Sequence, residues 1–339
     1  LKSCELPKLA DKIDLTGDQT IKFEPPDQNP IRHIIAVDGG FQPVQLRDEF
    51  PSSEMWFYQF GALIFSIDDL EKLEDQPFID PDDISKLKQI QRLKLALPVR
   101  NVNITGQPSL THSVRVAIRN FFSAKTDNSS LMDTLKWLIF QEYSTPADEW
   151  VLSSCPTCDT RDVALRRREI LPGATFKCPN CASDIYLTDV FRLHEAIDDE
   201  LGAGGIVSYV GTTIEQLIIV HLIRLILETK PDLLNHILFI KDGPLAFFGQ
   251  TANMHKPLRD LVKFLLNNHT LFLAGLEKTG AFVEHADQIA SKLDKGQILL
   301  LGNDYIYRYI IPGSPEAPYG RTTYYGNKLI FKTNAGRMF

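Results

Sequence analysis

Four of the five cysteines form two closely spaced pairs, and their spacing constrains the fold of the middle of the chain. The pairs are C-x-x-C motifs, Cys155 with Cys158 and Cys178 with Cys181, and nineteen residues separate them. Two residues between thiolates let one turn direct both sulfurs at one ion, and two such turns complete a tetrahedral zinc shell. Four thiolates leave no position for water or substrate, so we expect a structural zinc ribbon over residues 150–187.

The role of this ribbon stays open at the level of the sequence. Its basic side chains are Arg161, Arg166, Arg167, Arg168 and Lys177. A grip on DNA, a solvated run of charge, a docking surface for a partner and simple stabilisation of the insertion fit these residues equally. The fifth cysteine, Cys4, stands alone, and we interpret it as an incidental thiol.

Length and composition set limits on fold and partners. The chain has 339 residues with 44% hydrophobic content, enough for about two domains. Its net charge of −7 counts weakly against a nucleic-acid binder, although a local basic groove can coexist with an acidic average. The longest apolar segment, 214–227, contains polar residues, so we expect a buried amphipathic helix and no membrane association. The start of the chain has neither Met nor a signal pattern, so we expect a cytoplasmic protein with upstream residues removed.

Apolar periodicity predicts alternating strands and helices. Expected strands are 31–37, 55–67, 236–241, 270–276, 297–301, 305–311 and 322–332. Expected helices are 82–97, 109–122, 131–143, 189–201, 212–227, 253–266 and 284–293. This alternation predicts an α/β fold with a mixed sheet flanked by helices.

Two of the expected strands stop at Asp-Gly, at Asp38 and at Asp242. Ligands of open α/β sheets bind outside the carboxyl ends of strands, so parallel neighbours would direct both carboxylates into one cleft. A hard divalent cation between them relieves their repulsion, and such sites act on phosphates. Asp-Gly is also a common turn signal, and either aspartate alone therefore proves little.

A third metal ligand is expected from a helix packed on the sheet. Glu215 lies in the apolar helix 212–227, where a carboxylate is costly unless it has a partner or reaches solvent. Capping of that helix is the alternative role, and Glu200 and Glu228 are rivals for the ligand role. Lys278 follows a later strand, where it can contact a scissile phosphate or be an ordinary surface lysine.

These segments, in their order along the chain, resemble the NurA nuclease family. The resemblance rests on Val37-Asp38-Gly39-Gly40, the helical Glu215, Asp242-Gly243-Pro244-Leu245 and Leu276-Glu277-Lys278-Thr279, and it extends from about residue 31 to the end. It implies an RNase H-like mixed sheet flanked by helices. With the ribbon inserted, the expected layout is a lead-in at 1–30, the first part of the core with a helical insertion at 31–149, the ribbon at 150–187, and the second part of the core at 188–339.

The resemblance also implies a mechanism and partners. Asp38, Glu215 and Asp242 would bind manganese or magnesium, and Lys278 would assist. The family's late histidine has no clear equivalent, because His285 follows Lys278 too closely, so the equivalent is expected beyond the end of this chain. Asp304 is a second candidate, although its position after strand 297–301 favours an ordinary turn residue. Members form dimers and act on DNA with a hexameric HerA-type ATPase, which implies DNA end processing or antiphage defence.

Two other classes of protein remain as alternatives. The first is a phosphatase or phosphotransferase with Asp38 as a covalent nucleophile. Gly40 counts against it, because such sites often place a second acid there. The second is a non-catalytic adaptor, in which an RNase H-like scaffold and the zinc ribbon only dock other proteins.

Overall fold

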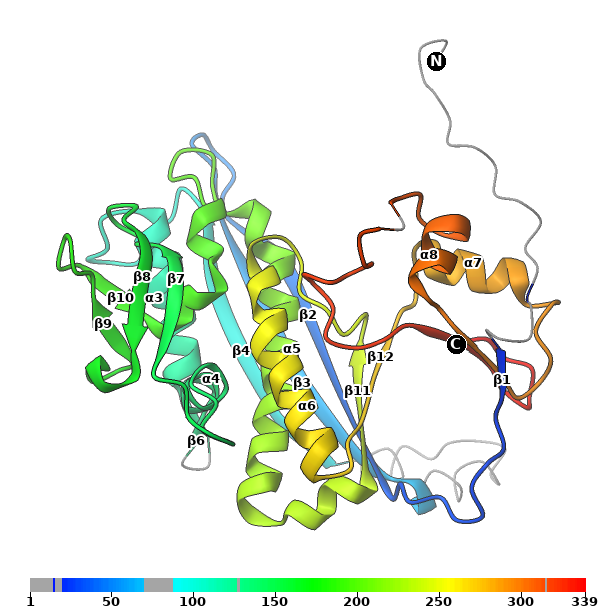
Figure 1. The fold of residues 1–339 in the computed structure, drawn as a ribbon. Helices are drawn as coiled ribbons and strands as arrows, with labels where there is room; N and C mark the ends of the chain where they lie inside the picture. The colour runs from blue at the N-terminus through cyan, green and yellow to red at the C-terminus, as the bar shows by residue number, and fades with distance from the viewer. Residues whose placement is uncertain (1–14, 16–19, 70–87, 127–128, 315) are drawn as a thin grey trace, which may run out of the picture. The chain divides into compact units, whose positions relative to one another are not determined.

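The structure is a computed structural model, and it describes residues 15, 20–69, 88–126, 129–314 and 316–339 (Figure 1). The chain divides into two compact units, which we treat separately. The sheet unit comprises 30–241 and 247–274, and the terminal unit comprises 1–29, 242–246 and 275–339. The layout of four segments expected from the sequence stays a prediction.

A five-stranded sheet with the order β12-β11-β2-β3-β4 organises the sheet unit. Its strands are β2 (His33–Arg47), β3 (Ser53–Ser66), β4 (Lys88–Arg100), β11 (Ile237–Asp242) and β12 (Phe272–Leu276). β3 runs antiparallel to both β2 and β4, whereas β11 runs parallel to β2. The predicted α/β fold with a mixed sheet is therefore confirmed.

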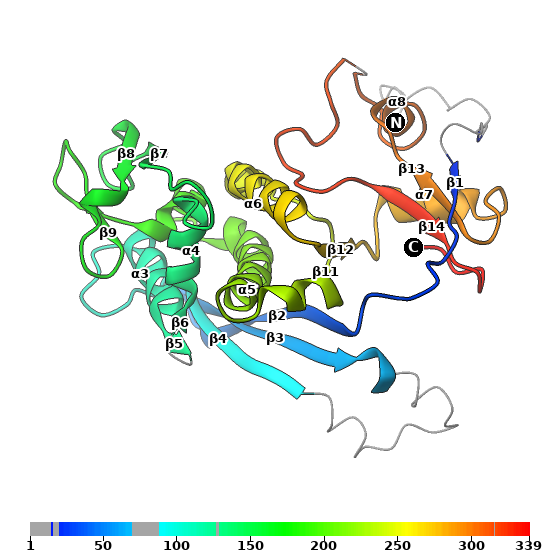
Figure 2. The same cartoon turned by 60° about the horizontal axis from the view of Figure 1, so that its bottom comes forward.

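Helices cover one face of this sheet (Figure 2). They are α3 (Leu110–Ser123), α4 (Leu131–Ile139), α5 (Val207–Thr229) and α6 (His255–Asn268). α5 packs against β2, β3 and α4, and α3 packs against β4. Residues 213–220 of α5 are all buried, which confirms the predicted buried helix but not its amphipathic character. A helix segment that neighbouring elements cover on all sides has no solvated face to carry polar residues.

The same helix has the composition of a membrane span. The segment Gly204–Thr229 is long enough to cross a bilayer and has a mean hydropathy of 1.6. Within its most apolar window, 61% is buried inside the structure. A core helix shows that burial, because its apolar side chains pack against other elements of the same chain.

Two long strands differ from the prediction. β2 does not turn at Asp38 but continues to Arg47, because β3 pairs with it over that whole length, with Asp38 opposite Gly61. The predicted helix 82–97 was wrong over its described part, because Lys88–Arg100 form β4, and 82–87 lie outside the described residues. Leu93, Leu95, Leu97 and Val99 alternate with the period of a strand, and β3 supplies their partner strand.

Three later predictions also need correction. The predicted helix 189–201 consists of two 3₁₀ turns, η2 (Leu187–Phe191) and η3 (Leu193–Ala196), separated by Arg192 with a left-handed φ of 60°. The predicted strand 305–311 is a helix, α8 (Asn303–Tyr309), which packs Tyr305 and Ile306 into a core. The predicted strand 322–332 is reduced to β14 (Leu329–Lys332).

The terminal unit has its own small sheet and core. Its strands, in the order β1-β13-β14, are β1 (Thr20–Lys22), β13 (Gln297–Leu300) and β14, all antiparallel. α7 (Ala281–Ile289) and α8 complete this unit. The core comprises Ala286, Ile289, Leu293, Leu299, Tyr305 and Ile330.

The remaining strands are short antiparallel pairs within the sheet unit. They are β5 (Lys125–Thr126) with β6 (Ser129–Ser130), β7 (Glu149–Ser154) with β8 (Arg161–Arg166), and β9 (Thr175–Lys177) with β10 (Asp184–Tyr186). The last two pairs carry the cysteines.

Candidate functional site

Both C-x-x-C motifs form the same kind of turn, each between the strands of one hairpin. The amide of Cys155 donates to the carbonyl of Thr160 at 2.8 Å, and the amide of Asp159 donates to the carbonyl of Cys155 at 3.1 Å. The second motif repeats both bonds, from Cys178 to Ser183 and from Ala182 to Cys178, each at 3.0 Å. Asp159 and Ala182 share a left-handed φ of 55° and 58°. Two equivalent turns thus present two pairs of thiols.

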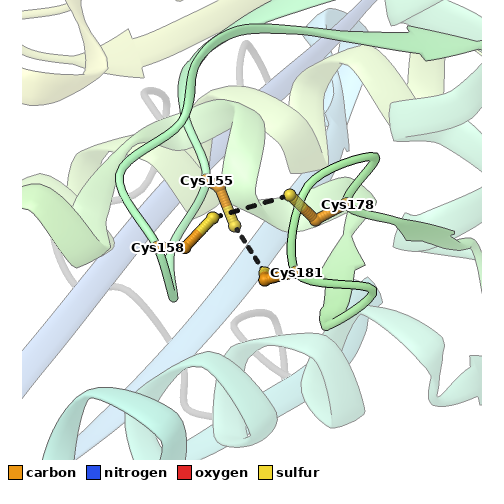
Figure 3. A group of neighbouring side chains, drawn as sticks. All are labelled: Cys155, Cys158, Cys178 and Cys181. Carbon is orange, nitrogen blue, oxygen red and sulfur yellow. Dashed lines mark hydrogen bonds between the residues drawn. The ribbon is translucent and has the colours of Figure 1, made fainter.

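The four sulfurs converge on one point, as Figure 3 shows. Their ligand atoms all lie within 4.8 Å of one another, with Cys155 Sγ 3.8 Å from Cys181 Sγ and Cys158 Sγ 3.7 Å from Cys178 Sγ. A tetrahedron with Zn–S bonds of about 2.3 Å has S–S edges of about 3.8 Å. The predicted cysteine cluster is confirmed, and its geometry suits a single metal ion such as zinc.

The surroundings of the thiols differ. A hydrogen bond with the Thr160 hydroxyl, at 3.1 Å, and one from the Thr160 amide lower the pKa of Cys158 to about 6. Burial raises the pKa of Cys155 to about 12. Hydrogen bonds to Cys158 favour the thiolate that binds metal, whereas a buried Cys155 thiolate needs a cation beside it.

Four of the five basic side chains of the ribbon have acidic partners. The ion pairs are Arg166 with Glu149 at 3.5 Å, Arg167 with Glu142 at 3.8 Å, Arg168 with Glu169 at 3.9 Å, and Lys177 with Asp184 at 2.6 Å. Glu169 is shared by Arg166 and Arg168, and Glu142 is shared by Arg167 and Lys136, so these acidic groups offset only part of the positive charge. The role of the ribbon therefore stays open among the interpretations that the sequence offered.

The strands that carry the two Asp-Gly motifs are parallel neighbours, as the sequence argument required. The register places Lys241 of β11 opposite Val37 of β2, and an aspartate follows each of them in the chain. β11 ends at Asp242, and Gly243 follows with a φ of +81°. Asp38 is exposed within the longer β2, where its carboxylate accepts a hydrogen bond from the amide of Gly39 at 3.0 Å.

Glu215 lies inside α5 and not at its start. The helix begins at Val207, eight residues earlier, so Glu215 is more than two turns from the terminus and does not cap it. The residue is only 8% exposed, and its Oε2 lies 3.8 Å from Nζ of Lys241, which is 2% exposed. A carboxylate at this depth is tolerated because a cation accompanies it.

Gly39 makes room for Glu215 against the sheet. A Cβ at Gly39 would lie 3.0 Å from Glu215 Oε1 and 2.6 Å from the ring of Phe60. The pairing of β2 with β3 is regular here, so successive residues face opposite sides of the sheet. Glu215 therefore approaches β2 on the face of Gly39, and the neighbouring Asp38 belongs to the other face.

In the terminal unit the structure joins two of the predicted site residues. Nζ of Lys278 lies 2.9 Å from Oδ2 of Asp242, and 70% of the lysine side chain is exposed. Their segments meet closely, because the Gly243 amide donates to the Leu276 carbonyl at 2.7 Å and a Cβ at Gly275 would lie 2.5 Å from the Gly243 carbonyl. A cation and a carboxylate are thereby held together at the surface.

The rival ligands have other surroundings. Glu228 forms an ion pair with Arg224 at 2.7 Å near the end of α5, and Glu200 is exposed. His285 is buried and hydrogen-bonds to the Tyr305 hydroxyl at 2.8 Å, whereas Asp304 is exposed in the first turn of α8. The sequence argument overlooked Lys241, although a charge inside an apolar strand was the signal that pointed to it.

Comparison with known proteins agrees with the resemblance. The chain matches a family model described as the NurA domain over residues 32–337, which is nearly its whole length. Neither the comparison with curated proteins nor the comparison with solved structures returned a match. The match includes the segments that carry Asp38, Glu215, Asp242 and Lys278. The chain therefore belongs to the NurA family of nucleases.

Proposed function

We propose that this protein is a divalent-metal-dependent deoxyribonuclease that hydrolyses phosphodiester bonds. Membership of the NurA family over residues 32–337 is the observation that carries the proposal. Asp38, Glu215 and Asp242 would hold manganese or magnesium, and Lys278 would assist at the phosphate. An ion held there would activate a water molecule and stabilise the departing oxygen. The mixed sheet, with its first three strands antiparallel and β11 parallel to β2, is consistent with an RNase H-like core.

The donors suit such an ion. All three are carboxylates, the oxygen ligands that hard divalent cations prefer. Gly39 has no Cβ, which lets the Glu215 carboxylate and the Phe60 ring both approach β2 closely.

The lysines have separate tasks in this proposal. Lys241 neutralises Glu215 inside the protein and holds its carboxylate beside Gly39. Lys278 is exposed, so its ammonium can exchange the Asp242 carboxylate for a phosphate oxygen of the substrate. Both act by charge and position, and neither has to donate or accept a proton.

We assign zinc to the four cysteines, as a structural ion. Four thiolates close a tetrahedral shell, and their spacing of 3.7 to 3.8 Å across the cluster suits zinc. The ion would hold the two hairpins β7–β8 and β9–β10 together, because each hairpin supplies two of the four ligands.

The partners are proposed from the family. They are DNA, a second copy of the chain in a homodimer, and a hexameric HerA-type ATPase that moves the DNA. The cellular role would be DNA end processing or antiphage defence, in the cytoplasm. These proposals rest on the membership of the chain in the NurA family.

Cleavage of linear double-stranded and single-stranded DNA tests the proposal. Wild type, Asp242→Asn and the control Asp294→Asn, an exposed aspartate outside the proposed site, would be assayed with manganese, magnesium or EDTA, alone and with a HerA-type ATPase. We expect metal-dependent degradation by wild type and the control, and at least about 100-fold slower degradation by Asp242→Asn. Absence of degradation under every condition would contradict the proposal and favour the adaptor alternative.

A further inference from the structure

The strand that carries Asp38 also carries an aromatic side chain that is partly exposed to solvent. Phe41 of β2 is 43% exposed, and its ring centroid lies 5.6 Å from that of Trp56 and 5.4 Å from that of Tyr58. Both neighbours are held in place, since the Trp56 indole donates to Glu54 at 2.6 Å and the Tyr58 hydroxyl donates to the Val207 carbonyl at 3.0 Å. Phe41 is thus an accessible ring on a fixed aromatic support.

Phe41 and Glu215 share one face of the sheet. Gly39 and Phe41 are two residues apart on β2, so both face α5. On α5, Gly211 and Glu215 are four residues apart and lie on one side of the helix. Glu215 approaches Gly39, and a Cβ at Gly211 would lie 3.2 Å from the Phe41 ring. The packing of α5 on β2 therefore places the Glu215 carboxylate and the Phe41 ring one after the other along β2.

The spacing along β2 matches a nucleic acid. Two strand residues span about 7 Å. Nucleotides stacked along one strand rise by about 3.4 Å each, so this span corresponds to about two nucleotides. Rings with an accessible face bind bases of any sequence by stacking, which is how proteins hold single strands without sequence preference.

We propose that Phe41, supported by Trp56, is a stacking site for a nucleobase of single-stranded DNA about two nucleotides from the scissile phosphate. This inference rests on the proposed nuclease function and names its substrate as an unpaired strand. A base in a duplex stacks on its own neighbours, so this ring selects strands or ends whose bases are unpaired.

The chain offers a matched control. Phe57 of β3 is 42% exposed, almost the same as Phe41. It pairs with Gln42 and therefore lies on the opposite face of the sheet from Phe41 and Tyr58. A general effect of removing an exposed phenylalanine would appear in both variants, whereas stacking beside Glu215 involves Phe41 alone.

The test is binding of a single-stranded oligonucleotide that contains 2-aminopurine, measured in EDTA so that cleavage does not enter. The fluorescence of 2-aminopurine falls when the base stacks. We expect quenching by wild type and Phe57→Ala, retained quenching in Phe41→Trp, and loss of quenching in Phe41→Ala and Phe41→Leu. Binding by Phe41→Ala should weaken at least about fivefold, the lower limit for one base stacked on an aromatic ring.

Several outcomes would overturn the inference. They are equal quenching by wild type and Phe41→Leu, equal losses in Phe41→Leu and Phe57→Ala, or no quenching by wild type. Phe41→Leu keeps an apolar side chain and protects the test if Phe41→Ala fails to fold. A protein that binds and quenches as expected but never cleaves DNA with metal would contradict the proposed nuclease while leaving the stacking site in place.

Discussion

Gly39 shows how one residue can determine whether a site exists. The side chain of Glu215 lies against β2 only because Gly39 has no Cβ there. The neighbouring Gly40 is different, since nothing lies within 4 Å of the position its Cβ would take. A side chain at Gly39 would collide with its neighbours, whereas a side chain at Gly40 would meet nothing. Substitution of these two adjacent glycines therefore shows whether the crowding at Gly39 matters.

Gly39→Ala should therefore damage the protein where Gly40→Ala does not. The added methyl group would press on the Phe60 ring and on Glu215 Oε1. We expect the free energy of unfolding to fall by about 1–3 kcal/mol and DNA cleavage to slow by about 100-fold. Denaturant unfolding and cleavage assays of both variants check this, and equal behaviour of the two would show that Gly39 does not shape the site.

His194 gives a prediction about pH. Burial lowers the pKa of His194 below its ordinary value of 6.5, and neither ring nitrogen has a hydrogen-bond partner among the described residues. The unfolded chain therefore takes up this proton first as the pH falls. The neutral His194 ring therefore contributes its full share to the free energy of unfolding above about pH 6.5. Below that pH the free energy of unfolding falls, by at most about 1.4 kcal/mol per pH unit, until the pH reaches the lowered pKa of the folded state.

The measurement compares wild type with His194→Leu by denaturant unfolding at pH 7.5 and pH 5.5. Wild type should lose more stability than the variant over this interval, because leucine takes up no proton. Parallel losses in the two proteins would mean that His194 is not held neutral by the fold.

At this scale the sequence predicted local chemistry and missed long-range packing. The cysteine cluster was predictable because two short motifs contain all four ligands. The approach of Glu215 to Gly39, and its ion pair with Lys241, join residues far apart in the chain. Both contacts form only because α5 packs on the sheet, and no spacing of residues within the sequence predicts that packing.

At the scale of elements, a buried ion pair connects α3 to the segment that follows the ribbon. Arg115 of α3 donates to both carboxylate oxygens of Asp189 in η2, at 2.9 and 2.7 Å, and to the carbonyl of Asp184 in β10 at 2.8 Å. Both side chains are at most 5% exposed. Removing one partner of such a pair leaves a buried charge without compensation, so this contact fixes the end of the ribbon.

Loss of the ribbon's metal should unfold the ribbon before the rest of the chain. Cys155→Ser removes one ligand, and we expect loss of bound zinc and a lower Tm, because metal binding contributes directly to folding. A chelator should act in the same way on wild type. Metal analysis and thermal unfolding test this, with Cys4→Ser, which lies outside the described residues, as the control. Unchanged zinc and Tm in Cys155→Ser would refute the structural zinc site.

Elements were predictable where one periodicity dominated. The helices α3, α4 and α6, and the strands β3, β11 and β12, lie close to the predicted ranges. β4 was mistaken for a helix because only its pairing with β3 selects the strand. α8 was mistaken for a strand because its aromatic and apolar residues suit either element, and burial of Tyr305 and Ile306 on one helical face decides the outcome.

At the scale of the whole molecule, the family match and the residue pattern support the same conclusion. The NurA domain covers residues 32–337 and so includes the cysteine ribbon as well as both Asp-Gly motifs. The mixed sheet could be predicted from the alternation of elements, whereas its strand order could not, because β11 joins β2 across more than 180 residues of intervening chain. The central claim is that the carboxylates of Asp38, Glu215 and Asp242 hold a divalent metal ion that the protein needs to cleave DNA.

Manganese binding and DNA cleavage by Glu215→Gln test this claim most directly. Glutamine keeps the size of the side chain and removes the charge, and Glu228→Gln on the same helix, whose carboxylate already pairs with Arg224, is the control. The account predicts that Glu215→Gln loses both manganese binding, followed by electron paramagnetic resonance, and cleavage, while Glu228→Gln keeps both. Manganese binding and cleavage at wild-type levels in Glu215→Gln would contradict it.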